Sequence, residues 1–146
     1  MDIETIEFNG IQIPVMITTA NGNLNKVFTI DYKLLLINKD LALKTLWEEY
    51  FKFVESNLFP VIFAHNLGNF DGYFIFKALS SYANPDKIST IIDPHNAFIQ
   101  ISLKTSSGVI INWRDSQRIF PVSLKELCKI FGIRGKISEY NTFLTV

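Results

Sequence analysis

The sequence predicts one mixed α/β domain in which a sheet is flanked by helices, and three observations support this fold class. The chain has 146 residues, which suits a single domain over residues 1–146. Residues 3–30 alternate apolar and polar side chains around turn-forming residues, a pattern typical of strands. Later segments place apolar residues at helical spacing, and the helical and strand patterns then follow one another along the chain.

The first part of the chain predicts three strands. Apolar residues from Ile3 to Ile17 alternate with polar ones, and Asn9-Gly10 between them is a strong hairpin signal. A second turn at residues 21–23 precedes a third strand at residues 27–30. These strands are expected to form the first part of the sheet.

The middle of the chain predicts a helix, a buried strand and a second helix. Asp40 is expected to cap a helix through residue 55, where the apolar residues fall at helical spacing. After Pro60, the short apolar run at residues 61–64 predicts a central strand. A further helix is expected at residues 70–81.

The last part of the chain returns to strands and ends in a helix. Strands are expected at residues 88–92, 97–103 and 109–113. Ser123 is expected to begin a helix whose apolar stripe contains Cys128, and Gly132 is expected to end it.

Composition narrows the classes of function. Hydrophobic residues make up 48% of the chain, which argues against disorder, and no apolar run approaches the roughly 20 residues of a membrane span. The acidic N-terminal segment is unlike a signal peptide, so secretion and membrane partners are not expected. Cys128 is the sole cysteine, which excludes an internal disulfide and a Cys-rich zinc site. The formal net charge of zero argues against tight general nucleic-acid binding, but not against a narrow single-strand groove.

Three carboxylates form the candidate catalytic set. Asp2 and Glu4 are two residues apart on the first strand, so they point to one face of the sheet. Asp71 follows the strand at residues 61–64, at an end where open α/β sheets place their sites. Taken separately, the first pair is explained by a solvated chain end, and Asp71 by a helix first turn. Together they are hard oxygen ligands that suit two Mg²⁺ or Mn²⁺ ions.

Asp71 belongs to an unusual connection, FAHNLGNFDGYF, at residues 63–74. A plain strand-to-helix turn needs about one Gly and one cap. This segment carries in addition an imidazole, amides and several aromatic rings. Its glycines are expected to give room and unusual dihedral angles, so that the backbone comes close to a ligand.

The motifs resemble those of the 3′→5′ exonuclease domain of family B DNA polymerases. Asp2-Ile3-Glu4 is similar to the family's first exonuclease motif, and residues 66–74 are similar to the second. The form of the second motif, and the segment at residues 112–133 with its Asp-Ser after a strand, resemble the protein-primed branch. That branch occurs in phages, adenoviruses and linear mitochondrial plasmids, so the resemblance suggests a viral, phage or mitochondrial origin.

The resemblance implies a ribonuclease H-like fold and proofreading by two-metal hydrolysis of the last phosphodiester of single-stranded DNA. Asp2, Glu4 and Asp71 would be the catalytic residues and would bind Mg²⁺ or Mn²⁺. Other matching positions would hold the 3′ end of the DNA: His65, Asn66, Phe70, Phe74 and Ser116. A looser match gives a further contact region at Arg134, Lys136 and Tyr140.

The sequence departs from the family at one motif. The third motif, Tyr-x-x-x-Asp on a following helix, would supply a fourth carboxylate, and it is not found at the expected place. Tyr82 and Asp86 are four positions apart but come too early in the chain, and Tyr140 is followed four positions later by Leu144. The chain is therefore expected to be a truncated piece of a larger DNA polymerase, with weak or absent activity. Its expected partners are a single-stranded DNA 3′ end, the rest of the polymerase and a terminal protein primer.

Two other functions compete with proofreading. One is a non-catalytic nucleic-acid-binding module of the same fold, and the other is a ribonuclease H-like nuclease outside replication. For individual residues, a structural role of His65 competes with strand contact. Asp93 and Asp115 lie at predicted strand ends, where each could approach the site, but a capping or turn role is expected.

Overall fold

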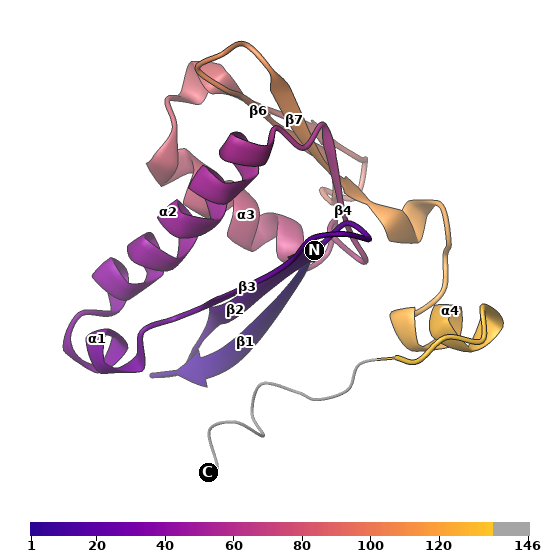
Figure 1. The fold of residues 1–146 in the computed structure, drawn as a ribbon, viewed down its shortest axis with the longest axis horizontal. Helices are drawn as coiled ribbons and strands as arrows, with labels where there is room; N and C mark the ends of the chain where they lie inside the picture. Colours follow the sequence, from indigo (N-terminus) through magenta and orange to yellow (C-terminus); the bar gives the residue numbers. More distant parts are fainter. Residues whose placement is uncertain (136–146) are drawn as a thin grey trace.

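The computed structural model describes residues 1–135 and shows two sheets with two long helices against them (Figure 1). The elements are, in chain order, β1 (Asp2–Phe8), β2 (Ile11–Ala20), β3 (Asn25–Thr29), α1 (Tyr32–Ile37), α2 (Lys39–Asn57), β4 (Val61–Ala64), α3 (Asp71–Tyr82), the 3₁₀ turn η1 (Pro85–Lys87), β5 (Ile88–Ile92), β6 (Phe98–Lys104), β7 (Ile110–Asp115), the 3₁₀ turn η2 (Ser116–Arg118) and α4 (Leu124–Ile130). The predicted mixed α/β class is confirmed.

The first three strands form an antiparallel meander in the order β1-β2-β3. The predicted hairpin at Asn9-Gly10 is present, and both residues have positive φ, 52° and 79°. Such angles suit a tight turn between twisted strands, and Asn-Gly adopts them readily. Ile3 pairs with Ile17 and both are buried, so this face of the meander packs on the core.

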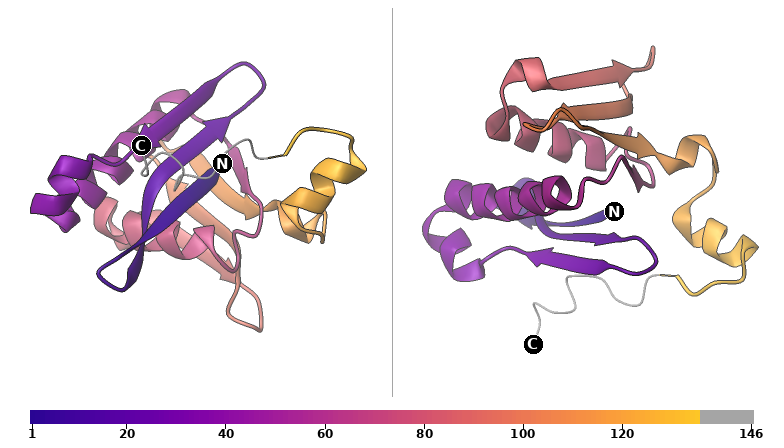
Figure 2. Two further views of the ribbon diagram at one scale, coloured as in Figure 1. Left: turned by 90° about the horizontal axis from the view of Figure 1, so that it is seen from below. Right: turned by 45° about the horizontal axis from the view of Figure 1, so that its top comes forward.

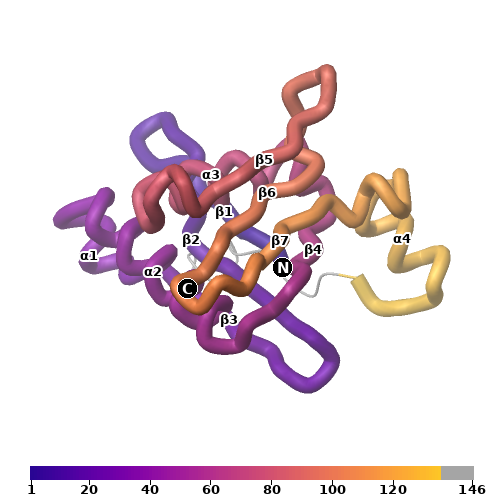
Figure 3. The backbone as a smooth tube through the Cα atoms, turned by 90° about the horizontal axis from the view of Figure 1, so that it is seen from above, coloured from indigo at the N-terminus to yellow at the C-terminus, as the bar shows by residue number. Residues whose placement is uncertain are grey.

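The later strands form a mixed sheet in the order β4-β7-β6-β5, in which β4 is parallel to β7 and the other pairs are antiparallel. The prediction of β4 as a central strand is wrong for this sheet, because β4 lies at its edge. The start of β1 lies beside the open side of β4, as Figure 3 shows. There the Met1 amino group donates a 2.6 Å hydrogen bond to the carbonyl oxygen of Phe63.

Helices α2 and α3 pack against each other and against both sets of strands (Figure 2). Helix α2 contacts β2 and β3, and α3 contacts β6. Aromatic side chains fill much of the shared core: Tyr50 and Phe51 of α2 are fully buried, and so is Trp113 of β7. The Trp113 Nε1–H donates a 3.0 Å hydrogen bond to the Tyr50 hydroxyl, which links α2 to the mixed sheet.

One predicted helix cap is wrong, and one helix was not predicted. The first long helix begins at Lys39 and is capped by Asn38, not by Asp40: the Asn38 side chain accepts from the Leu41 N–H at 3.1 Å. Before it lies the short helix α1, which was not predicted, and Asp31 caps α1 in the same way. The predicted Ser123 cap of α4 is confirmed by a 3.2 Å bond from the Glu126 N–H.

The apolar stripe expected on the last helix packs only in part. Cys128 is buried, but Leu124 is 38% exposed and Phe131, which follows the helix, is 58% exposed. Within residues 1–135, no helix combines the length and the hydropathy that crossing a membrane requires.

Candidate functional site

The connection between β4 and α3 turns sharply at Asn66. This residue has a φ of 68°, a left-handed conformation that Asn tolerates better than most side chains. Its carbonyl oxygen accepts from the N–H groups of Asn69 and Phe70, and the Gly72 N–H bonds to the Leu67 carbonyl oxygen at 2.8 Å. The unusual dihedral angle expected of the glycines in this loop therefore belongs to Asn66.

The two glycines of the connection are required by close packing. A Cβ on Gly68 would lie 2.8 Å from the carbonyl oxygen of Phe98, and one on Gly72 would lie 2.6 Å from that of Leu67. Both distances are shorter than side chains accept, so the backbone comes as close to its neighbours as it can without a side chain. The structure shows the close approach as contact with the chain's own backbone. The expected approach to a ligand stays a prediction.

Asp115, at the end of β7, holds the same connection from the neighbouring strand. Its side chain accepts from the Asn66 N–H at 2.9 Å and from the Gly68 N–H at 3.0 Å. It also accepts from the Gln117 N–H at 2.9 Å, which makes it the cap of η2. The expectation of a capping role is confirmed, and the bonds to Asn66 and Gly68 add a long-range role.

His65 and Ser116, both predicted to contact the DNA strand, lie together. The His65 Nδ1 and the Ser116 Oγ are 3.0 Å apart, and the His65 Nε2 lies 2.6 Å from the carbonyl oxygen of Val122. Because a carbonyl oxygen only accepts, Nε2 is the donor in the bond to Val122. His65 thus ties the end of β4 to the first residue of η2 and to Val122 after it, which supports its structural role.

Phe70 and Phe74, both predicted to contact the DNA end, lie at the start of α3. Phe70 is 40% exposed, and its ring packs edge-on against Phe74 with the centroids 5.4 Å apart. The Asn66 side-chain oxygen accepts from Asn69 at 3.2 Å. One aromatic face and one amide therefore stand at the surface next to the buried part of the loop.

Asp71 is the first residue of α3 and is only 2% exposed. Burial raises the pKa of the Tyr50 hydroxyl far above its ordinary value, and the negative charge of Asp71 adds to this rise. Burial also lowers the pKa of the Met1 amino group, while the charges of Asp2 and Asp71 both oppose that change. The charges of Asp2 on β1 and of Asp71 on α3 therefore both raise the pKa of the same amino group, that of Met1.

Asp2 and Glu4 are half-buried on β1, on either side of the buried Ile3. This alternation places both carboxylates on one face of the strand, as expected. Within residues 1–135, however, no three His, Cys, Asp or Glu side chains form a group arranged to hold a metal ion. The donor types suit Mg²⁺ or Mn²⁺, but the three carboxylates do not form a finished metal cage.

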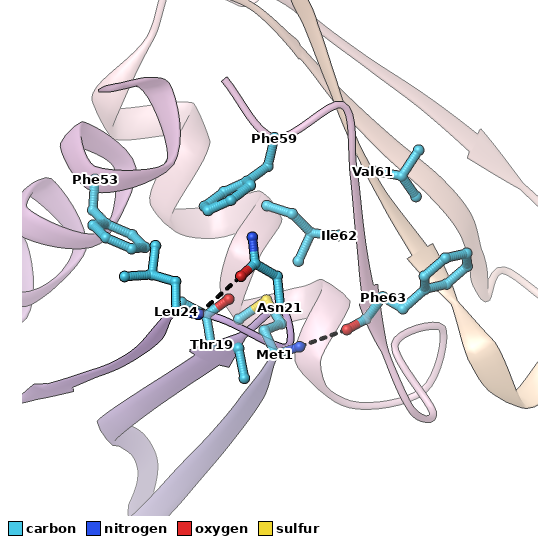
Figure 4. A pocket seen from close by; sticks show the side chains of 10 residues that line it. Met1, Thr19, Asn21, Leu24, Phe53, Phe59, Val61, Ile62 and Phe63 are labelled. Carbon is cyan, nitrogen blue, oxygen red and sulfur yellow. Dashed lines mark hydrogen bonds between the residues drawn. The ribbon is translucent and has the colours of Figure 1, made fainter. Parts of the chain in front are cut away.

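A cavity of about 180 Å³ lies beside Met1, between the β2–β3 turn, the end of α2 and β4 (Figure 4). Its walls are largely apolar, with Phe53, Phe59 and Ile62 among them. None of the predicted site residues in the described part of the chain lines this cavity. Of the looser contact region, Arg134 is exposed, whereas Lys136 and Tyr140 lie outside the described residues.

The structure resembles that of the phi29 DNA polymerase. Complexes of that enzyme with primer-template DNA and nucleotide, with primer-template DNA, and with single-stranded DNA match with TM-scores of 0.68, 0.69 and 0.69. Sequence identity is 16% in each, over 94–95% of this chain. The chain spans about a quarter of the length of that polymerase, 23–24%. No family model and no curated protein matches the chain. The structural match agrees with the predicted fold, a mixed sheet flanked by helices, and is consistent with a ribonuclease H-like fold.

Proposed function

We propose that this chain is a 3′→5′ exonuclease domain related to that of protein-primed family B DNA polymerases, acting on the 3′ end of single-stranded DNA. The observation that carries the proposal is the position of Asp71. It is a buried carboxylate at the first turn of a helix, and its charge acts on the same amino group as that of Asp2. The shared fold with the phi29 DNA polymerase supports a domain related to DNA polymerases.

The residues around the β4–α3 connection would hold the DNA end. The exposed face of Phe70 would stack on a terminal base, which suits an enzyme that removes any base, because every base has a π face. The Asn66 amide offers both donors and acceptors to the sugar or base. His65, Phe74 and Ser116 would line the strand. In the structure His65 already bonds to Ser116, so these two would act as one fixed wall.

Asp2, Glu4 and Asp71 would hold the divalent cations. Two such ions roughly 3.5–4 Å apart supply an activated water and stabilise the departing 3′ oxygen. Mg²⁺ is commonly held by one or two carboxylates together with phosphate oxygens of the substrate. The absence of a finished three-ligand group within residues 1–135 is compatible with a site that the DNA phosphate completes.

The same absence favours a second candidate, a nucleic-acid-binding module without catalysis. In that case the loop and its aromatic rings would bind single-stranded DNA, and the three carboxylates would serve folding or solubility. The two candidates differ in whether binding of the DNA end depends on divalent cations and on Asp71.

The partners proposed for the chain are the rest of a polymerase and its terminal protein primer. Several large apolar residues near the end of the described chain are exposed and would suit contact with another part of such a protein: Ile119, Phe120, Leu124, Ile130, Phe131 and Ile133. This surface supports the first partner, and the resemblance alone supports the second.

Shortening of a 5′-labelled single-stranded DNA in Mn²⁺, together with Mn²⁺ affinity from calorimetry, tests the proposal. We expect slow removal of nucleotides from the 3′ end of the DNA and little action on the matching RNA. A chelator should abolish the removal of nucleotides. Asp71→Asn should weaken Mn²⁺ binding on the order of tenfold or more, because it removes one charged ligand. Asp31→Asn, the same chemical change at the cap of α1, should leave Mn²⁺ binding unchanged.

Two results would decide against the exonuclease. Binding of single-stranded DNA that ignores chelator and Asp71→Asn alike would establish the non-catalytic module instead. Equal action on DNA and RNA 3′ ends would place the chain among ribonuclease H-like nucleases outside replication.

A further inference from the structure

We propose that Asp115 is a positioning residue that fixes the shape of the DNA-gripping loop, residues 65–70, from the neighbouring strand. This role rests on the proposed function, because it assigns a purpose to the loop geometry in binding a DNA 3′ end. Asp115 itself is 7% exposed and contacts the backbone of the loop, so it is not proposed to touch DNA.

The contacts show that both carboxylate oxygens of Asp115 are used. Oδ1 accepts from the N–H groups of Asn66 and Gln117, each at 2.9 Å, and Oδ2 accepts from the N–H of Gly68 at 3.0 Å. Asp115 pairs with Ala64, the last residue of β4, in the parallel register. One side chain therefore bonds to the residue that turns the loop, to the glycine in its middle and to the 3₁₀ turn that carries Ser116.

The loop needs such an anchor because its own conformation is unfavourable. Asn66 is held in the left-handed region, and a non-glycine residue there costs about 1 kcal/mol or more. Gly68 lies so close to β6 that its carbonyl oxygen accepts from the Phe98 N–H at 3.3 Å. Backbone N–H groups buried in this way cost free energy unless they are bonded, and Asp115 supplies acceptors for two of them.

The chemistry of these contacts requires a carboxylate. An ionised carboxyl group only accepts hydrogen bonds, so it can serve three N–H donors at once. An Asn side chain has the same shape, but one of its two positions is an NH₂ group. Whichever way it turns, that group faces a backbone N–H, and at least one bond of the clamp is replaced by two opposed donors.

The consequence for DNA is indirect. The bonds from Asp115 fix Asn66, and with it the backbone that leads to Phe70. Ser116, the residue after Asp115, bonds to His65. The groups proposed to hold the 3′ end are thus ordered before DNA binds, so binding avoids the entropic cost of ordering them.

Asp115→Asn tests this role through binding of a fluorescent single-stranded DNA with a free 3′ end, measured by anisotropy over a series of salt concentrations. We expect the Kd to rise roughly tenfold. The slope of log Kd against log salt should stay as in the wild type, because no phosphate contact is lost. Asp31 caps α1 and is distant in sequence from residues 65–70. Asp31→Asn is therefore the matched control, and it should bind DNA as the wild type does.

Amide hydrogen exchange gives a second readout that a general loss of stability would not reproduce. In the free wild-type chain the amides of Asn66 and Gly68 should already be protected. In Asp115→Asn the exchange of one or both should accelerate far more than that of core amides such as Ile101. The wild-type measurement stands even if the variant does not fold.

Three results would overturn the role. The first is unprotected Asn66 and Gly68 amides in the wild type, and the second is an unchanged Kd in a folded Asp115→Asn with accelerated exchange. The third is a wild type that binds no single-stranded DNA, which also ends the proposed function. Protected amides in such a protein would show that the clamp exists and that the function assigned to it is wrong.

Discussion

At the scale of single residues, Asn66 and the two glycines of the loop after β4 meet different structural requirements. Asn66 takes the left-handed conformation, whereas Gly68 and Gly72 have no space for a Cβ. The residue types of this segment mark it as unusual in the sequence. They do not distinguish a left-handed conformation from a lack of space, because the crowding comes partly from Phe98, which lies far along the chain.

Replacing Gly68 by Ala should destabilise the protein by about 1–3 kcal/mol, the usual range for overpacking. The new Cβ would meet the Phe98 carbonyl oxygen at 2.8 Å and the Asp115 Oδ2 at 3.2 Å, and backbone atoms move aside only at a cost. Denaturant unfolding measures the change. Gly135→Ala is the matched control, since no atom of the described residues is found within 4 Å of that Cβ. Equal stability of Gly68→Ala and wild type would contradict the close packing of the loop.

Asp115 also shows a limit of prediction at this scale. Its place after a strand predicted a capping role, and its bond to Gln117 N–H confirms this. Its bond to Asn66 joins residues 49 positions apart. Such a contact follows from the parallel pairing of β4 with β7, which residue types alone do not specify.

At the scale of elements, the sequence predicted strands better than helix ends. The bounds of β4 and β5 agree with the predicted ones, because turn residues and Pro60 delimit short apolar runs. Helix α1 was missed, since its apolar residues are consecutive rather than periodic and only Leu35 is buried. The start of α2 was misplaced because Asn38 and Asp40 are both good caps and tertiary packing decides between them.

The link between α2 and β7 can be tested through Tyr50. Tyr50→Phe would leave the buried Trp113 Nε1–H without its acceptor, and would also remove the 3.1 Å bond from the hydroxyl to the Met1 Sδ. A buried donor left unsatisfied costs about 1–3 kcal/mol, so the free energy of unfolding should fall by that amount. Tyr73→Phe is the control, because the Tyr73 hydroxyl bonds to Asn96 at the surface. Similar effects of both changes would argue against a special role for the buried pair.

The turn between β5 and β6 should respond to acid through Asp93. Hydrogen bonds from the Ala97 N–H, then from Arg118 and the His95 N–H, hold the pKa of Asp93 below its ordinary value. A carboxyl whose pKa is lower in the folded state stabilises that state above its unfolded pKa of about 3.9. The contribution is lost as the pH falls through the lower, folded value.

NMR titration of the Asp93 carboxyl carbon measures this shift. We expect a midpoint below 3.9, and a higher midpoint in Arg118→Ala, which removes the 2.6 Å contact between the guanidinium group and Oδ2. A midpoint at or above the ordinary value in the wild type would show that the turn does not hold the ionised form.

At the scale of the whole molecule, the fold class followed from the order of elements, but the junction of the two sheets did not. In the described chain the meander and the mixed sheet meet where the Met1 amino group bonds to Phe63. This contact brings the start of β1 next to β4, the strand that leads into the connection before α3. Motif order along the chain predicts that the carboxylates of β1 and α3 converge, and this convergence stays a prediction.

The central claim is that carboxylates of β1 and of α3 share cations, and paramagnetic broadening by Mn²⁺ tests it most directly. In a ¹⁵N–¹H NMR spectrum of the whole chain, small additions of Mn²⁺ should broaden the amide signals of residues 2–4 and of residues 71–72 together. Asp71→Asn should weaken the broadening of both groups. Broadening confined to one segment, or centred on surface acids such as Glu48, would contradict the account.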